Sequence, residues 1–88
     1  MVGQFVKAKA GHDKDTLYVV VREEGRFVYL CDGKTKTPEK SKKKSRKHIQ
    51  PIDVFVPVEL IEKIKQGSKV YPEEIKYEIK KYLATEGK

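Results

Sequence analysis

The spacing of apolar residues changes near Pro57, and this change limits the possible folds more than any other feature of the chain. Before Pro57 the apolar residues alternate with polar ones or form short β-branched and aromatic runs, as in 17–22 (LYVVVR). After Pro57 they recur at the three- and four-residue intervals of a helix. We therefore expect a β module in residues 1–53 and a helical appendage in residues 54–88.

Three strands are predicted with clear patterns, at 4–9, 17–22 and 26–31, because these segments are rich in β-branched and aromatic residues. Gly25 separates the second strand from the third, and Gly33 follows the third. Each glycine can supply the positive φ of a tight hairpin turn. These strands should form a meander.

Two further strands are predicted around the basic part of the chain. Pro38 lacks a backbone donor, which indicates an edge strand around 36–39, and 47–52 should return as the fifth strand. Five short strands joined by tight turns predict a small SH3-like barrel, half open, whose edges close on each other. The expected fold class is thus mainly β with a C-terminal α segment, and the basic run becomes the loop between strands four and five.

Two short helices are predicted after the barrel, one at 58–66 and one that begins at Pro72. In the second, Ile75, Ile79, Tyr82 and Leu83 form an apolar stripe that must be buried. Helices this short need a partner surface. The stripe can pack on the barrel, on the other helix or on a second copy, and the sequence leaves this choice and the oligomeric state open.

The whole net charge of +7 lies in the stretch 34–48, which holds eight basic residues against the single acid Glu39. A balanced domain with one concentrated basic segment is suited to a polyanion, so RNA or DNA is the expected partner. Because lysines dominate, we expect contacts to phosphates, strong salt dependence and little base readout. The candidate phosphate-binding residues of this stretch are Lys34, Lys36, Lys40, Lys42, Lys43, Lys44, Arg46, Lys47 and His48.

A second basic element comprises the end of the first strand and the turn that follows it. The strand is closed by a glycine that permits an unusual φ or the close approach of an RNA backbone. Its candidate RNA-binding residues are Lys7, Lys9, Gly11, His12 and Lys14.

The aromatic residues offer two roles, core packing or stacking of unpaired bases. Phe5 and Phe27 are assigned to the core, whereas Tyr18 and Tyr29 fit either role. The tail tyrosines Tyr71, Tyr77 and Tyr82 are assigned to helix docking.

Catalytic and metal sites are not expected. His12 with Asp13 and Asp15 nearby lacks a nucleophile of matching geometry, and His12, Cys31 and His48 lack metal-ligand spacing. The single cysteine, Cys31, excludes an intrachain disulfide and is predicted to be a small buried residue. We expect no cofactor. The absence of a long apolar run predicts a cytoplasmic protein without a membrane partner.

The N-terminal part of the chain resembles a KOW motif, which is a strand, a loop with a diagnostic glycine and a second strand. The matching features are the segment 3–6 (GQFV), Gly11, Lys14 and the apolar runs 18–21 and 27–30. Residues 3–51 as a whole are similar to the archaeal and eukaryotic large-subunit ribosomal protein family fourteen-e, and most closely resemble its short bacterial relatives, which are KOW-domain RNA-binding proteins with a similar helical tail.

This resemblance implies an SH3-like barrel that binds RNA without catalysis, with ribosomal RNA, the ribosome or transcription–translation proteins as partners. Gly11 matches the diagnostic glycine, and Lys47 with His48 matches the terminal basic strand of the family. One departure is Asp15, which stands where the loop often has a second glycine. A protein-interaction module is the alternative, because SH3-like barrels also bind peptides and partner proteins.

Overall fold

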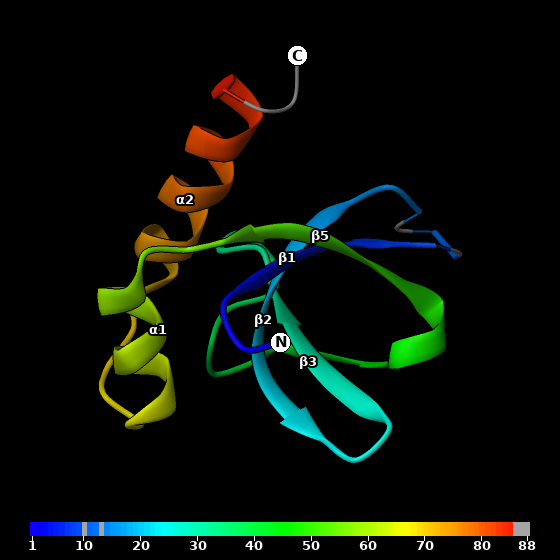
Figure 1. The fold of residues 1–88 in the computed structure, drawn as a ribbon, viewed down its shortest axis with the longest axis horizontal. Helices are drawn as coiled ribbons and strands as arrows, with labels where there is room; N and C mark the ends of the chain where they lie inside the picture. The colour runs from blue at the N-terminus through cyan, green and yellow to red at the C-terminus, as the bar shows by residue number, and fades with distance from the viewer. Residues whose placement is uncertain (10, 13, 86–88) are drawn as a thin grey trace.

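The structure is a computed structural model that describes residues 1–9, 11–12 and 14–85. In chain order the elements are β1 (Gln4–Ala8), β2 (Leu17–Glu24), β3 (Phe27–Cys31), β4 (Lys42–Ser45), the 3-10 turn η1 (Arg46–His48), β5 (Ile49–Phe55), α1 (Val58–Lys65) and α2 (Pro72–Thr85) (Figure 1). The strands form one antiparallel sheet in the order β4-β3-β2-β1-β5. The prediction of a mainly β chain that ends in helices is confirmed.

The sheet is not closed, in contrast to the predicted barrel with joined edges. β4 and β5 are its two edge strands, and no pairing joins them within the described residues. β4 has only four residues and pairs with β3 alone. The η1 turn then carries the chain to the opposite edge of the sheet, where β5 pairs with β1.

The fourth strand lies at Lys42–Ser45, so the prediction of a strand around 36–39 is wrong. The predicted tight turn after β3 is also wrong, because residues 32–41 form a longer connection. The carboxylate of Asp32 organises this connection by accepting hydrogen bonds from the backbone N–H groups of Lys34 (2.8 Å) and Lys36 (2.9 Å). The middle of the basic run is therefore a strand and not a loop.

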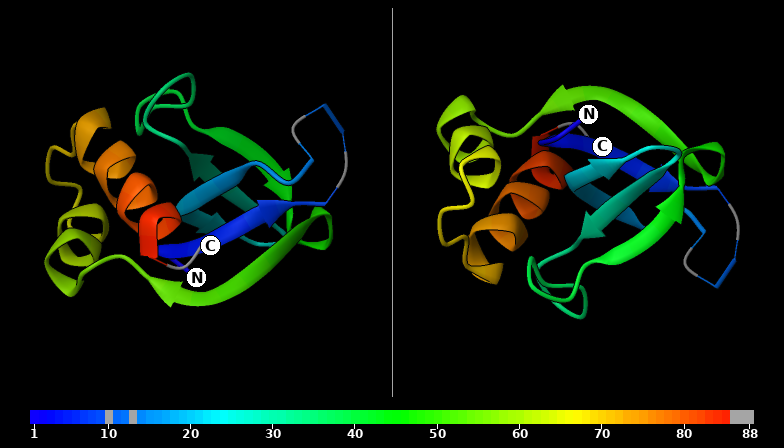
Figure 2. Two further views of the ribbon diagram at one scale, coloured as in Figure 1. Left: turned by 90° about the horizontal axis from the view of Figure 1, so that it is seen from above. Right: turned by 90° about the horizontal axis from the view of Figure 1, so that it is seen from below.

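The sheet is curled, and the helices lie at one side of it (Figure 2). Both faces of the sheet are buried, which explains why β2 reads as a continuous apolar run. One face packs against the helices. This helix-side core consists of Phe5, Leu17, Val19, Cys31, Val56, Leu60, Val70 and Ile75. The other face is buried by strand residues, with the Met1 side chain packed against them. This strand core consists of Val6, Ala8, Tyr18, Val20, Val28, Leu30 and Ile49.

The helices dock on the sheet, which resolves the choice that the sequence left open. Ile75 is fully buried, and the Tyr82 ring stacks on Phe5 with centroids 4.9 Å apart. The C-terminal end of α2 projects beyond the sheet, and Leu83 there is exposed, contrary to the predicted stripe (Figure 1). Tyr71 and Tyr77 are also exposed, so their assignment to helix docking is wrong.

The two helices are joined by an ion pair at their near ends. The Lys63 ammonium donates to the Glu74 carboxylate (2.8 Å), which also accepts a hydrogen bond from the Tyr71 backbone N–H (2.9 Å). These two interactions, the Lys63 hydrogen bond first, lower the pKa of Glu74. The same carboxylate thus caps the first turn of α2 and ties it to α1.

Gly33 connects the β3–β4 loop to the start of α2. Its φ is +76°, and a Cβ there would lie 2.5 Å from the Pro72 carbonyl oxygen and 2.6 Å from the Lys76 backbone nitrogen. Backbone atoms of a helix cannot move aside cheaply. Glycine is therefore required at this position for the close approach of the loop and the helix.

We predict that Gly33→Ala destabilises the protein more than Gly25→Ala. Gly25 has a φ of +60°, and a Cβ added there would have no atom within 4 Å, so its substitution costs only the left-handed backbone penalty of about 1 kcal/mol. Gly33→Ala adds a clash, for a total of roughly 2 to 4 kcal/mol. Urea unfolding of both variants measures the difference, and equal losses would contradict the close packing of the loop on α2.

Candidate nucleic-acid interface

The basic stretch 34–48 runs along one edge of the molecule in three parts. Its first part lies in the β3–β4 connection near α2, its second is β4, and its third is η1. The first part is linked to the helical segment by the ion pair of Glu39 with Lys69 (3.0 Å). The third part, η1, lies against the end of β1, where the Lys9 backbone N–H donates to the His48 carbonyl (2.9 Å).

Both views in Figure 2 place η1 and the β1–β2 connection at the end of the sheet away from the helices. Residues 34–48, together with Lys9, Gly11, His12 and Lys14, are called the basic band below. The basic band begins in the loop beside α2, follows the edge strand β4 and ends in the β1–β2 connection. It is therefore an extended band and not a compact patch.

The loop part of the band has an ordered backbone. Asp32 holds the N–H groups of Lys34 and Lys36, and its other carboxylate oxygen accepts from the Thr35 hydroxyl (3.3 Å). Lys34 and Lys40 are exposed, whereas Lys36 is half-buried. Lys34 and Lys40 are therefore presented to solvent from a fixed loop.

The three consecutive lysines of β4 do not share one face. Lys42 pairs in register with Leu30 and Lys44 with Val28, so these two project on the side of the strand core. Lys43 pairs with Tyr29 and projects on the opposite face. Its ammonium lies 4.4 Å from the centroid of the Phe27 ring. The run therefore presents charge on both faces of an edge strand, a position where lysine also discourages strand–strand aggregation.

Arg46 is engaged in holding the fold. Its guanidinium donates to the Gly25 carbonyl (2.9 Å), to the Glu23 carboxylate (3.0 Å) and to the Met1 sulfur (3.1 Å). Burial raises the pKa of Glu23, but the hydrogen bonds and charges of Arg46 and of the N-terminal ammonium outweigh this effect and lower it. Arg46 thus joins η1 to the β2–β3 turn and the N-terminus.

Among its described residues, the β1–β2 connection has a left-handed backbone at two positions. Gly11 has a φ of 94° and Asp15 a φ of 69°. The Asp15 N–H donates to the Ala8 carbonyl (2.9 Å), and its carboxylate lies 3.5 Å from the Lys14 ammonium. The positive φ at Asp15 explains why a glycine often occupies this position in the KOW loop. The Asp15 carboxylate partly neutralises the charge of Lys14. Asp13, named above as a neighbour of His12, lies outside the described residues.

The predicted site residues separate into groups. Lys9, Lys47 and His48 meet at one end of the band, whereas Lys34, Lys36 and Lys40 lie toward the helices. Lys7 is exposed on β1, in register with Leu17 and Gln50. The structure therefore does not gather all of the predicted residues at one point.

The aromatic residues are now assigned by burial. Phe5 and Tyr18 are buried, so they are closed to base stacking, whereas Phe27 and Tyr29 are half-buried. Each of the half-buried rings has a cation above it, and for Tyr29 this is the Arg22 guanidinium at 5.2 Å from the centroid. Arg22 could not be predicted from the sequence, because its position opposite Tyr29 follows a register shift in the β2–β3 ladder.

No group of three His, Cys, Asp or Glu side chains suited to a metal ion occurs in the part of the chain that the structure describes. Cys31 is buried, as predicted, and burial raises the pKa of its thiol to about 11. None of the described helices is long and apolar enough to cross a membrane.

No protein-family model matches the chain, and a search of curated proteins finds no match.

We predict that Arg46→Gln destabilises the protein while Lys47→Gln does not. Both changes remove one positive charge from η1, but only Arg46 has the three hydrogen bonds described above. We expect a loss of roughly 1 to 2 kcal/mol for Arg46→Gln, because its acceptors are partly exposed. Lys47 is exposed and should change stability little. Thermal unfolding of the two variants measures this, and equal midpoints would show that Arg46 does not hold the fold.

Proposed function

We propose that this chain is a non-catalytic RNA-binding protein that contacts phosphates through the basic band. The observation that carries the proposal is the position of residues 34–48 along one edge of the molecule. These residues hold the entire net charge, and the positive and negative charges of the remaining residues cancel. Lysine ammonium groups act as point charges toward phosphate and do not read bases. Binding should therefore be strongly salt dependent.

We further propose that the sheet is a half-open SH3-like barrel of the KOW type. Three features support this. The strand core is built from strand residues with Met1 packed against it, a short 3-10 turn separates β4 from β5, and the described part of the β1–β2 connection is left-handed at Gly11 and Asp15. The resemblance to ribosomal family fourteen-e makes ribosomal RNA in the cytoplasm the proposed target.

A protein-interaction function is the second candidate, and a specific surface favours it. Phe55, Val58, Tyr77 and Leu83 are exposed on β5 and the helices. A groove of about 430 Å³ between α1 and α2 is lined by apolar side chains that include Leu60 and by several glutamates. A partner segment with basic and apolar side chains fits this groove. The two candidate surfaces can be tested independently.

The RNA proposal predicts a localised effect of lysine neutralisation. Lys34→Gln, Lys40→Gln and Lys47→Gln, combined in one protein, remove three exposed charges from the band. With five or six phosphates bound, the slope of log affinity against log salt should be about −4 for the unmodified protein and flatten by about 2 in the variant. Fluorescence anisotropy with a labelled single-stranded RNA of about 12 nucleotides measures both slopes.

The matched control is Lys65→Gln, Lys80→Gln and Lys81→Gln, which removes three exposed charges from the helices. This variant has the same net charge as the first and should keep a slope near that of the unmodified protein. An equal loss in both variants would show that net charge, and not the band, controls binding. Salt-independent binding would contradict the mechanism altogether.

Asp15→Asn should strengthen RNA binding. The substitution removes the acid beside Lys14 and keeps a residue type that tolerates the left-handed conformation. Removal of one repulsive charge at a distance of several ångströms in water should raise the affinity about twofold at low salt. The gain should disappear at high salt, where exposed charges are screened. An unchanged affinity at low salt would place the RNA away from this connection.

A further inference from the structure

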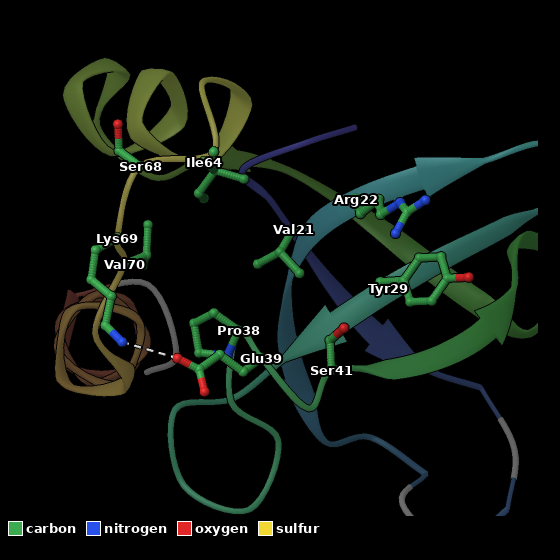
Figure 3. Close-up of a pocket in the computed structure, with 11 residues that line it drawn as sticks. Val21, Arg22, Tyr29, Pro38, Glu39, Ser41, Ile64, Ser68, Lys69 and Val70 are labelled. Carbon is green, nitrogen blue, oxygen red and sulfur yellow. Dashed lines mark hydrogen bonds and ion pairs between the residues drawn. The ribbon is translucent and has the colours of Figure 1, made fainter.

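A cleft of about 560 Å³ opens between the sheet and the segment that joins α1 to α2 (Figure 3). Its apolar lining comes from Val21 of β2, Pro38 of the β3–β4 connection, and Ile64 and Val70 of the helical segment. The volume lies within the range of roughly 300 to 1,000 Å³ that is typical of small-molecule sites. Pro38, Glu39 and Ser41 of the basic band line this cleft, but none of its lysines does.

The two ends of the cleft are polar. Tyr29 and Arg22 stand at one end, with the guanidinium above the ring, and Arg22 is held by Glu24 at 2.7 Å. The ion pair of Lys69 with Glu39 stands at the other end, as Figure 3 shows. The Ser41 side chain adds a hydroxyl group to the lining, whereas the Ser68 hydroxyl points away from the cleft in Figure 3.

This lining matches the chemistry of a nucleobase. A base has a flat π face that stacks on an aromatic ring or on a guanidinium plane, and a polar edge that bonds to hydroxyl and charged groups. The ring and the guanidinium of the Tyr29–Arg22 pair supply the stacking surface, and the Ser41 hydroxyl in the same lining can bond to the edge.

The cleft is also continuous with the basic band. Ser41 lines the cleft and directly precedes Lys42, the first residue of β4. Lys43 projects on the same face as Tyr29, its partner in the β3–β4 ladder. An RNA strand whose phosphates lie along β4 would therefore pass the mouth of the cleft.

We propose that this cleft binds an unpaired nucleobase of the RNA whose backbone occupies the basic band, with Tyr29 and Arg22 as the stacking pair. The proposal rests on the proposed RNA-binding function. It adds a preference for single-stranded or bulged RNA, which lysine contacts to phosphates do not provide.

The test compares a labelled single-stranded RNA of about 12 nucleotides with an abasic ribose–phosphate polymer of the same length, which has the phosphates but no bases. The unmodified protein should bind the RNA about tenfold more tightly than the abasic polymer. Tyr29→Ser should remove this difference and leave the salt slope unchanged, while Tyr29→Phe should keep it.

Tyr77→Ser is the matched control, because Tyr77 is exposed on α2 and lines the groove between the helices instead of the cleft. It should bind both polymers as the unmodified protein does. Arg22→Gln alters a side chain at the mouth of the cleft and should reduce the preference for RNA even if Tyr29→Ser does not fold.

Equal affinity of the unmodified protein for the two polymers would overturn this inference and leave the phosphate-binding function standing. An equal loss in Tyr77→Ser and Tyr29→Ser would overturn it as well. Binding of neither polymer would instead overturn the proposed function on which it rests.

Discussion

The antiparallel pairing of β4 with β3 is the interaction on which the basic surface depends. It converts four residues of the lysine-rich stretch into an edge strand and sends their side chains to alternate faces. The ordered loop around Asp32 and the Arg46 contacts to Gly25 and Glu23 hold the two ends of this strand. Charges that would repel one another in a flexible loop are thereby spread along a fixed line.

The second constraint is that both faces of the sheet are buried. The strand core uses the alternate residues of β1, β2, β3 and β5, and the other face needs Leu60, Val70 and Ile75 of the helical segment to cover it. The helices therefore share one hydrophobic core with the sheet. Their docking also forms the cleft in which Tyr29 and Arg22 lie.

Local patterns predicted the first three strands and both helices closely, because β-branched runs and helical caps act within a few residues. The fourth strand was missed, since its pairing with β3 depends on distant residues and on the turn that Asp32 builds. The sequence identified the basic residues as a group. It did not show that they are spread from the loop beside α2, along the edge strand β4, to the β1–β2 connection. It also could not show that Arg46 is engaged with Glu23 or that Arg22 lies above Tyr29, because both contacts follow from strand register.

The central claim is that RNA lies along the basic band, and amide NMR spectra of the protein titrated with single-stranded RNA test it most directly. The account predicts that chemical-shift changes concentrate at residues 34–48 and at Lys9, Gly11, His12 and Lys14, and that the exposed face of α2 around Tyr77 stays unchanged. Changes confined to α1 and α2, or no changes at all, would contradict it.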